Sequence, residues 1–254
     1  MTNSAPPPNS APAPSSTAPP VRGPRRVLVV GATGRLGVRI ARALRARDDR
    51  LVITARDATK LAAMQAELGG STFAKTVCVD LTSRDAPDRI AAEIRAEGGI
   101  DDVILACGPF PRTPFEELRR EDLERTLAVH AIAPLLLVAA LSPELIASQG
   151  AVIALGDAGV TRPYENHVAY LTAKGALQTG LRALAVELAP HVRINMVALG
   201  IVADPEADGD PLRTHRLATR SPLGRFGTSD EVAHVVLALL DATWATGEIW
   251  GIGR

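Results

Sequence analysis

Cysteine and aromatic residues are scarce in this chain. Its 254 residues include two cysteines, Cys78 and Cys107, and only 3% of the residues are aromatic. The two cysteines are not arranged as paired metal ligands, and both fall in stretches that we predict to be buried strands. We therefore expect neither a disulfide framework nor a metal site.

An excess of charge of one sign is also missing. Lysine plus arginine and aspartate plus glutamate each number 28, so the formal net charge is zero. The basic residues are spread along the chain and form no patch, which argues against a nucleic-acid partner. We expect a small-molecule substrate instead.

Long hydrophobic runs are absent too. The longest apolar stretch, residues 127–141, contains His130 and Pro134, and it is shorter than the roughly 20 residues that a membrane-spanning helix needs. Arg25 and Arg26 precede an apolar run, as they do in some export signals, but Gly31 ends that run after four residues. We expect no membrane segment and a cytoplasmic protein.

The composition changes sharply near residue 25. Residues 1–24 hold eight of the nineteen prolines, no acidic residue and, apart from Met1, one large apolar residue, Val21. Such a segment buries too little apolar surface to offset the entropy lost on ordering, so we predict a disordered tail rich in Pro, Ala and Ser. Residues 25–254 are long enough for one large core, and we predict a single domain.

The first folded stretch contains a glycine-rich turn. A short apolar run, residues 27–30, reads as a buried strand, and Leu36, Ile40 and Leu44 recur at helical spacing after it. Gly31, Gly34 and Gly37 therefore lie in a strand-to-helix turn. Backbone N–H groups and the helix dipole at such a turn favour a pyrophosphate, which predicts a nucleotide site.

Strands and helices alternate along the rest of the chain. This order predicts an α/β fold: a single Rossmann-type, doubly wound parallel sheet with helices on both faces. The expected strands are residues 27–30, 51–54, 76–79, 102–106, 151–155, 193–197 and 248–250. The expected helices are residues 35–44, 60–68, 86–97, 121–140, 166–188 and 231–240.

The end of the second predicted strand bears on cofactor choice. An acidic residue there binds the ribose of NAD, whereas an arginine nearby suits the 2′-phosphate of NADP. Here Ala55 occupies the end position and Arg56 follows it, and Arg35 lies in the glycine turn. These residues favour NADP(H) as the cofactor.

Two helices carry candidate catalytic groups. Pro134 lies inside the predicted helix 121–140 and cannot donate to the carbonyl of His130, so we expect a kink that leaves this acceptor free. Tyr170 and Lys174 are four residues apart on another helix and share one face. An ammonium beside a phenol favours the phenolate, so Tyr170 can act as an acid or base. An exposed helical pair is the alternative interpretation.

From residue 27 to about 247 the chain resembles the short-chain dehydrogenase/reductases. The matching segments are Gly31–Gly37, Asp80–Leu81, Tyr170–Lys174, Arg193–Asn195 and Thr246–Glu248. The resemblance implies that Tyr170 is the catalytic acid/base, that Lys174 holds the nicotinamide ribose and lowers the pKa of the tyrosine, and that Asp80 and Leu81 flank the adenine. The cofactor-binding residues it implies are Gly31, Thr33, Gly34, Arg35, Leu36, Gly37, Arg56, Asp80, Leu81, Ala106, Gly108, Tyr170, Lys174, Gly200 and Val202.

The chain departs from that family at several positions. The usual Asn-Asn-Ala-Gly is Leu105–Gly108, and His130 replaces an asparagine that acts through its main-chain carbonyl. Asp157, thirteen residues before Tyr170, replaces the catalytic serine. Together with Arg35 in the glycine turn, Asp157 is similar to the pteridine reductase and dihydromonapterin reductase branch. Phe110 matches a phenylalanine that stacks on the pterin there, although a core position is also consistent with the sequence.

These observations lead to one favoured function and two alternatives. We expect an NADPH-dependent reductase of a small planar, pterin-like substrate, with Asp157, Tyr170, Lys174 and His130 as catalytic residues and Phe110, Asp157 and Tyr170 contacting the substrate. A ketone reductase of the same family and a noncatalytic NADP(H)-binding protein are the alternatives. The polar segment 203–228 has no clear period and is a candidate substrate loop. The family resemblance also implies a homotetramer or homodimer.

Overall fold

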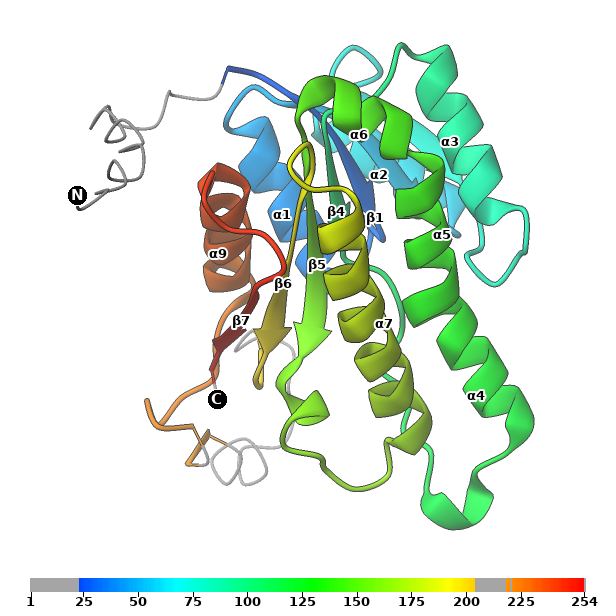
Figure 1. The fold of residues 1–254 in the computed structure, drawn as a ribbon, viewed down its shortest axis with the longest axis vertical. Coiled ribbons are helices and arrows are strands. Elements are labelled where there is room, and N and C mark those ends of the chain that lie inside the picture. The colour runs from blue at the N-terminus through cyan, green and yellow to red at the C-terminus, as the bar shows by residue number, and fades with distance from the viewer. Residues whose placement is uncertain (1–22, 204–217, 220, 254) are drawn as a thin grey trace, which may run out of the picture.

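The computed structural model describes residues 23–203, 218–219 and 221–253. They form one seven-stranded sheet in which every pairing is parallel, in the order β3-β2-β1-β4-β5-β6-β7. Helices cover both faces of the sheet (Figure 1). The predicted doubly wound fold is thereby confirmed.

The strands are short, and all except the two edge strands, β3 and β7, are mostly buried, as expected for a sheet covered on both faces. They are β1 (Arg26–Val30), β2 (Arg50–Ala55), β3 (Ala74–Cys78), β4 (Asp102–Leu105), β5 (Ala151–Asp157), β6 (Arg193–Leu199) and β7 (Ile249–Ile252). The α-helices are α1 (Arg35–Arg45), α2 (Ala58–Glu67), α3 (Ala86–Ala96), α4 (Arg120–Leu127), α5 (Ala133–Ala140), α6 (Ser142–Ser148), α7 (Val168–Glu187) and α9 (Ser229–Asp241).

Each strand contributes side chains to two separate cores. In β1, Leu28 and Val30 face one core and Val27 and Val29 the other, because side chains alternate along a strand. Apolar residues of α3, α5, α6 and α7 complete the first core, and those of α1, α2 and α9 complete the second. Burial on both faces explains why the inner strands β1, β4 and β5 read as nearly continuous apolar runs rather than alternating ones.

The long helix predicted around Pro134 runs without a break from α4 to α5, and the kink that we expected there stays a prediction. Between α4 and α5 the chain forms a π-helical segment, Ala128–Ile132, in which Ala133 donates to the carbonyl of Ala128. The wider π turn absorbs the missing proline donor inside the helix. Within the described residues, Arg120–Ala140 is also the one helix long and apolar enough to cross a membrane. Here α4 and α5 pack against α7 and α3 respectively.

Some local predictions need correction. Cys78 is exposed, and Cys107 is only partly buried and lies beyond the end of β4, so neither is in a buried strand position. The short helix α6 was not predicted. The predicted tail lies largely outside the described residues, and so does most of the candidate substrate loop.

The strand order indicates where a ligand site is expected in this sheet. The chain winds from β1 to β3 in one direction and from β4 to β7 in the other, so the crevice between β1 and β4 is the topological switch point. Ligands of open parallel sheets bind there, outside the carboxyl ends of the strands. The loops that follow β1, β4, β5 and β6 all leave from this edge.

Candidate active site

The glycine turn between β1 and α1 has the close backbone packing that a pyrophosphate site requires. Gly31 has a φ of +83°, and a Cβ on it would lie 2.8 Å from the carbonyl oxygen of Ala106. A Cβ on Gly37 would overlap the carbonyl of Gly31. Gly34 caps α1 without any side-chain hydrogen bond, so the first amides of the helix have no side-chain acceptor there. The turn therefore fits an anionic phosphate group.

Side chains that suit a nucleotide lie beside this turn. Arg35 and Arg56 are both exposed, Arg35 at the start of α1 and Arg56 after β2. Asp80 follows β3, and its Oδ1 accepts hydrogen bonds of 2.9 Å from the amide and the hydroxyl of Thr82. These two bonds hold the pKa of the Asp80 carboxyl below its ordinary value, with a smaller contribution from the Arg56 charge. Two arginines and an ordered aspartate fit the phosphorylated adenosine half of NADP(H).

Asp157, at the end of β5, is the centre of the hydrogen bonds around Tyr170. The Tyr170 hydroxyl, from α7, donates to Asp157 Oδ2 over 3.1 Å. The Tyr164 hydroxyl, from the loop before α7, donates to the same oxygen over 3.0 Å. The amide of Gly159 donates to Oδ1 over 2.7 Å. The structure thus brings the predicted acid/base tyrosine and the predicted aspartate into direct contact.

The surroundings of the Tyr170 hydroxyl favour its protonated form. Burial raises the pKa of Tyr170 well above its ordinary value, and the negative charge of Asp157 raises it further. The resemblance implied that Lys174 lowers this pKa; that contribution stays a prediction, and the net direction set by burial and Asp157 is upward. A carboxylate bonded to the hydroxyl opposes phenolate formation, so Tyr170 is held as a proton donor.

Lys174 is buried one helical turn beyond Tyr170. Its Nζ donates to the carbonyl of Leu155 over 2.8 Å and lies 5.8 Å from the centre of the Tyr170 ring. Burial lowers the pKa of the ammonium, while Cys107 and Asp157 act in the opposite direction. The bond to Leu155 holds the ammonium beside the last residues of β5, near the carboxyl edge of the sheet.

His130 is buried in the π-helical segment, and its side chain forms a hydrogen bond with the loop after β4. Its Nε2 donates to the carbonyl of Pro109 over 2.8 Å, and its ring lies edge-on to Tyr170 with centroids 5.2 Å apart. Burial lowers its pKa to about 3, and the Lys174 charge contributes to this, so the imidazole is neutral. Sequence reasoning assigned a role to the main-chain carbonyl alone. The side chain ties the loop after β4 to the helix that carries His130.

Phe110 lies in the site and not in a core, with 60% of its surface exposed. Its ring stacks on His167 at 4.4 Å and meets Tyr170 edge-on at 4.8 Å. The loops that carry these rings are joined where the amide of Thr113 donates to the carbonyl of Asn166 over 2.6 Å. One wall of the site is therefore aromatic, and the link between the loops holds it in place.

The remaining predicted cofactor residues lie along the same edge of the sheet. Ala106 and Gly108 follow β4, and Gly200 and Val202 follow β6. Gly200 and Val202 line a cavity of about 210 Å³ together with residues of the segment before α9. The adenosine-side residues, Arg56, Asp80 and Leu81, lie at the far end, beside β2 and β3.

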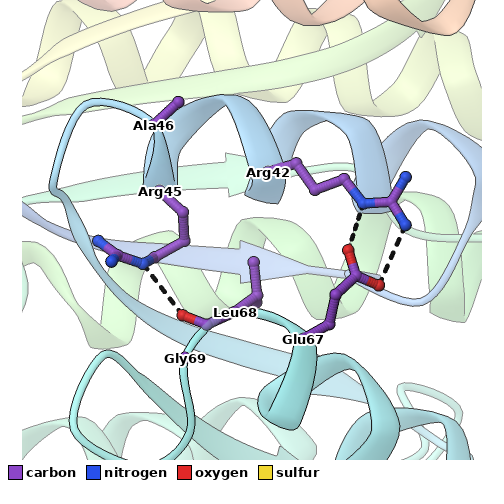
Figure 2. Close-up of a pocket in the computed structure, with 6 residues that line it drawn as sticks. All are labelled: Arg42, Arg45, Ala46, Glu67, Leu68 and Gly69. Atoms are coloured by element: carbon purple, nitrogen blue, oxygen red, sulfur yellow. Dashed lines mark hydrogen bonds and ion pairs between the residues drawn. The ribbon is translucent and has the colours of Figure 1, made fainter.

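A second cavity lies away from this edge. Its volume is about 400 Å³, and its lining residues come from the ends of α1 and α2. Figure 2 shows that Arg42 pairs with Glu67 there and that Arg45 donates to the carbonyl of Leu68. None of the predicted site residues lines this cavity. Nor do the described residues contain a cluster of three or more His, Cys, Asp or Glu side chains suited to a metal ion.

Sequence reasoning missed Tyr164, His167 and Gly159. Tyr164 and His167 belong to the irregular stretch before α7, which has no period that would mark them as facing Tyr170. The sequence offered one indication: tyrosine and histidine are rare in this chain, with two and five residues respectively, so each of them was worth considering as a site residue.

Comparisons with known proteins agree with this geometry. The profile of a family described as enoyl-(acyl carrier protein) reductase matches residues 31–252. L-xylulose reductase of Bos taurus is 31% identical over 222 residues, which are 85% of this chain and 88% of that protein. Neither of these matches is named as a pteridine reductase.

Solved structures agree as well. A short-chain dehydrogenase/reductase of Brucella melitensis, described as glucose/ribitol dehydrogenase, is 30% identical with a TM-score of 0.83 and covers 90% of this chain and 94% of its own. L-sorbose reductase of Gluconobacter frateurii, solved with NADPH and L-sorbose, is 21% identical with a TM-score of 0.83. The match covers 91% of this chain and 95% of that protein's chain. With Tyr170, Lys174 and the glycine turn in place, the chain belongs to the short-chain dehydrogenase/reductase family and is an oxidoreductase.

Proposed function

We propose that this protein is an NADPH-dependent reductase of a small substrate that carries a hydrogen-bond donor beside its reducible bond, a hydroxylated ketone in the first instance. One observation carries this proposal: a carboxylate, Asp157, lies beside the acid/base Tyr170 where the family has a serine. A carboxylate accepts hydrogen bonds, so it suits a substrate with an O–H or N–H group next to the reacting atom. L-xylulose and L-sorbose, after which two similar proteins are named, have hydroxyl groups beside their carbonyl.

The residues of the chain divide the work. NADP(H), when bound, supplies the hydride. Tyr170 gives its hydroxyl proton to the substrate oxygen, and Asp157 orients the substrate by accepting from the neighbouring hydroxyl. Lys174 holds the cofactor ribose, the glycine turn holds the pyrophosphate, and Asp80 and Leu81 flank the adenine. His130 and Phe110 shape the wall against which the substrate lies.

We propose NADP(H) over NAD(H) because of the two exposed arginines. Arg35 begins α1 and Arg56 follows β2, the strand that pairs with β1, and Ala55 provides no acidic group to repel a 2′-phosphate. Guanidinium groups form charge-assisted, bidentate hydrogen bonds with phosphate.

A pterin-like substrate is the second candidate, favoured by the aromatic wall. The ring of Phe110 is more than half exposed and lies beside Tyr170. A planar heterocycle can stack on that ring and present its N–H groups to Asp157. This is the narrower, pteridine-reductase-like interpretation of the sequence.

A panel of substrates separates the candidates. NADPH oxidation is measured with L-xylulose, L-sorbose, a ketone without hydroxyl groups, dihydrobiopterin and dihydrofolate. We expect the hydroxylated ketones to give the highest kcat/KM. A preference for dihydropterins establishes the second candidate, and a preference for the plain ketone contradicts the role given to Asp157.

Location and assembly follow the family resemblance. We propose that the enzyme acts in the cytoplasm as a homotetramer or homodimer. Light scattering of the purified protein tests the assembly, and fractionation of cells tests the location.

A further inference from the structure

The chain has two tyrosines, and both donate to the same atom. Their hydroxyls reach Asp157 Oδ2 over 3.0 Å from Tyr164 and 3.1 Å from Tyr170. Tyr170 is buried, whereas Tyr164 is 37% exposed and lies in the loop that leads to α7. The two phenols thus approach one carboxylate oxygen from two different segments.

The acceptor capacity of Asp157 is nearly filled by the protein. A carboxylate has about four acceptor positions. The amide of Gly159 uses one position on Oδ1, and the two tyrosines use two on Oδ2. When Tyr170 turns its hydroxyl toward the substrate, Oδ2 loses one donor and keeps the other.

We propose that Tyr164 is a positioning residue that holds the Asp157 carboxylate in place while Tyr170 exchanges its hydrogen bond from Asp157 to the substrate. This inference rests on the proposed function, because it needs Asp157 to receive a substrate donor. Without Tyr164, Asp157 would be held through Oδ1 alone during the exchange. Its carboxylate would then turn about the side-chain bond and lose its alignment with the substrate hydroxyl.

The backbone around Asp157 is built to admit the Tyr164 ring. A Cβ on Gly159 would overlap Tyr164 Cε1 and would lie 2.8 Å from Asp157 Oδ1. The ring therefore occupies the space that any other residue at position 159 would fill. The Tyr164 ring also packs edge-on against His167, with centroids 5.0 Å apart, which ties it to the aromatic wall.

Kinetics of Tyr164→Phe test the proposal, since this change removes only the hydroxyl. We expect kcat/KM for the preferred substrate to fall about tenfold, as for a lost hydrogen bond to a charged group, with NADPH affinity unchanged. In an Asp157→Ala background the same change should alter kcat/KM less than about twofold, because the two residues act as one unit. Thr161→Val is the matched control. It removes a hydroxyl from the same loop, but that hydroxyl donates to the carbonyl of Ala158 and not to Asp157. Parent-like kcat/KM in Tyr164→Phe overturns the proposal.

Titration of a single tyrosine tests the contact without any substrate. Tyr170→Phe leaves Tyr164 as the one tyrosine, and tyrosinate absorbance then reports its pKa directly. Burial and the Asp157 charge raise that pKa above the ordinary value. Asp157→Ala in this background should lower it. The substitution leaves the side chains of His167, His130 and Lys174 in place, and it removes the Asp157 charge that raises the pKa of Lys174.

The substrate assay and the tyrosine titration can contradict the proposed function and the role of Tyr164 independently of each other. A parent enzyme that reduces no hydroxylated ketone contradicts the proposed function but leaves the titration result standing. An unchanged Tyr164 titration after Asp157→Ala shows that the contact is absent in solution, and this overturns the inference even if the parent enzyme reduces ketones.

Discussion

The imidazole of His130 lies so close to Gly108 that no side chain fits between them. Gly108 has a φ of +109°, and a Cβ on it would overlap the ring of His130. The same imidazole donates to the carbonyl of the next residue, Pro109. The loop after β4 and the π-helical segment are therefore packed as one unit directly beside Tyr170.

We predict that Gly108→Ala destabilises the protein by more than the positive φ alone would. Gly70→Ala is the control, because Gly70 has a φ of +79° and open space around it. Strain alone costs about 1–3 kcal/mol, and overpacking adds about 1–3 kcal/mol. Urea unfolding of both variants measures the difference. Equal losses of unfolding free energy would show that the ring moves aside at no cost.

The neutral state of His130 predicts a loss of stability in acid. Its pKa is lowered to about 3 in the folded protein, against about 6.5 when unfolded. The unfolded state therefore binds a proton first as the pH falls, and stability declines between about pH 6.5 and pH 3 by up to about 1.4 kcal/mol per pH unit. His130→Asn should flatten this slope in urea unfolding at several pH values. The same change at the exposed His191 serves as the control.

Cofactor preference should depend on two arginines. We expect NADPH to bind at least about tenfold more tightly than NADH, which corresponds to about 1.4 kcal/mol. Arg35→Ala and Arg56→Ala should each reduce that ratio, whereas the exposed Arg182 on α7 should be replaceable without effect. Dissociation constants from fluorescence titration check this, and equal values for both cofactors in the parent would contradict it.

Tyr170→Phe should abolish turnover and leave the affinity for NADPH within a few-fold, because only the proton-donating hydroxyl is lost. Lys174→Ala should reduce both, because in our proposal its buried ammonium, which donates to the carbonyl of Leu155, also holds the cofactor ribose. Single-turnover reduction and cofactor titration measure the two effects. Turnover in the phenylalanine variant would place the proton donor elsewhere.

Replacing Asp157 by serine should alter substrate choice. A hydroxyl can donate to a plain ketone oxygen, whereas a carboxylate only accepts. We expect Asp157→Ser to lower activity on hydroxylated ketones, to lower activity on any dihydropterin turned over by about 100-fold or more, and to raise the relative rate on plain ketones. Unchanged substrate ratios would show that Asp157 does not contact the substrate.

The sequence alone determined the fold class, the glycine turn and the tyrosine–lysine pair. Each is a local pattern: apolar runs mark strands buried on both faces, glycines mark a strand-to-helix turn, and a spacing of four places Tyr170 and Lys174 on one face of α7. Such patterns depend on neighbours in the chain, so they can be read without knowing the tertiary structure.

The tertiary structure alone decided how these groups interact. Tyr164 and Tyr170 meet at one oxygen of Asp157 because β5, the following loop and α7 converge at the carboxyl edge of the sheet. That convergence raises the pKa of Tyr170, where the spacing of Tyr170 and Lys174 had suggested the opposite. Likewise, the π-helical segment that precedes Pro134 became visible only in the folded chain. Charge, burial and shared hydrogen-bond partners come from residues distant in the sequence, so only the folded chain determines them.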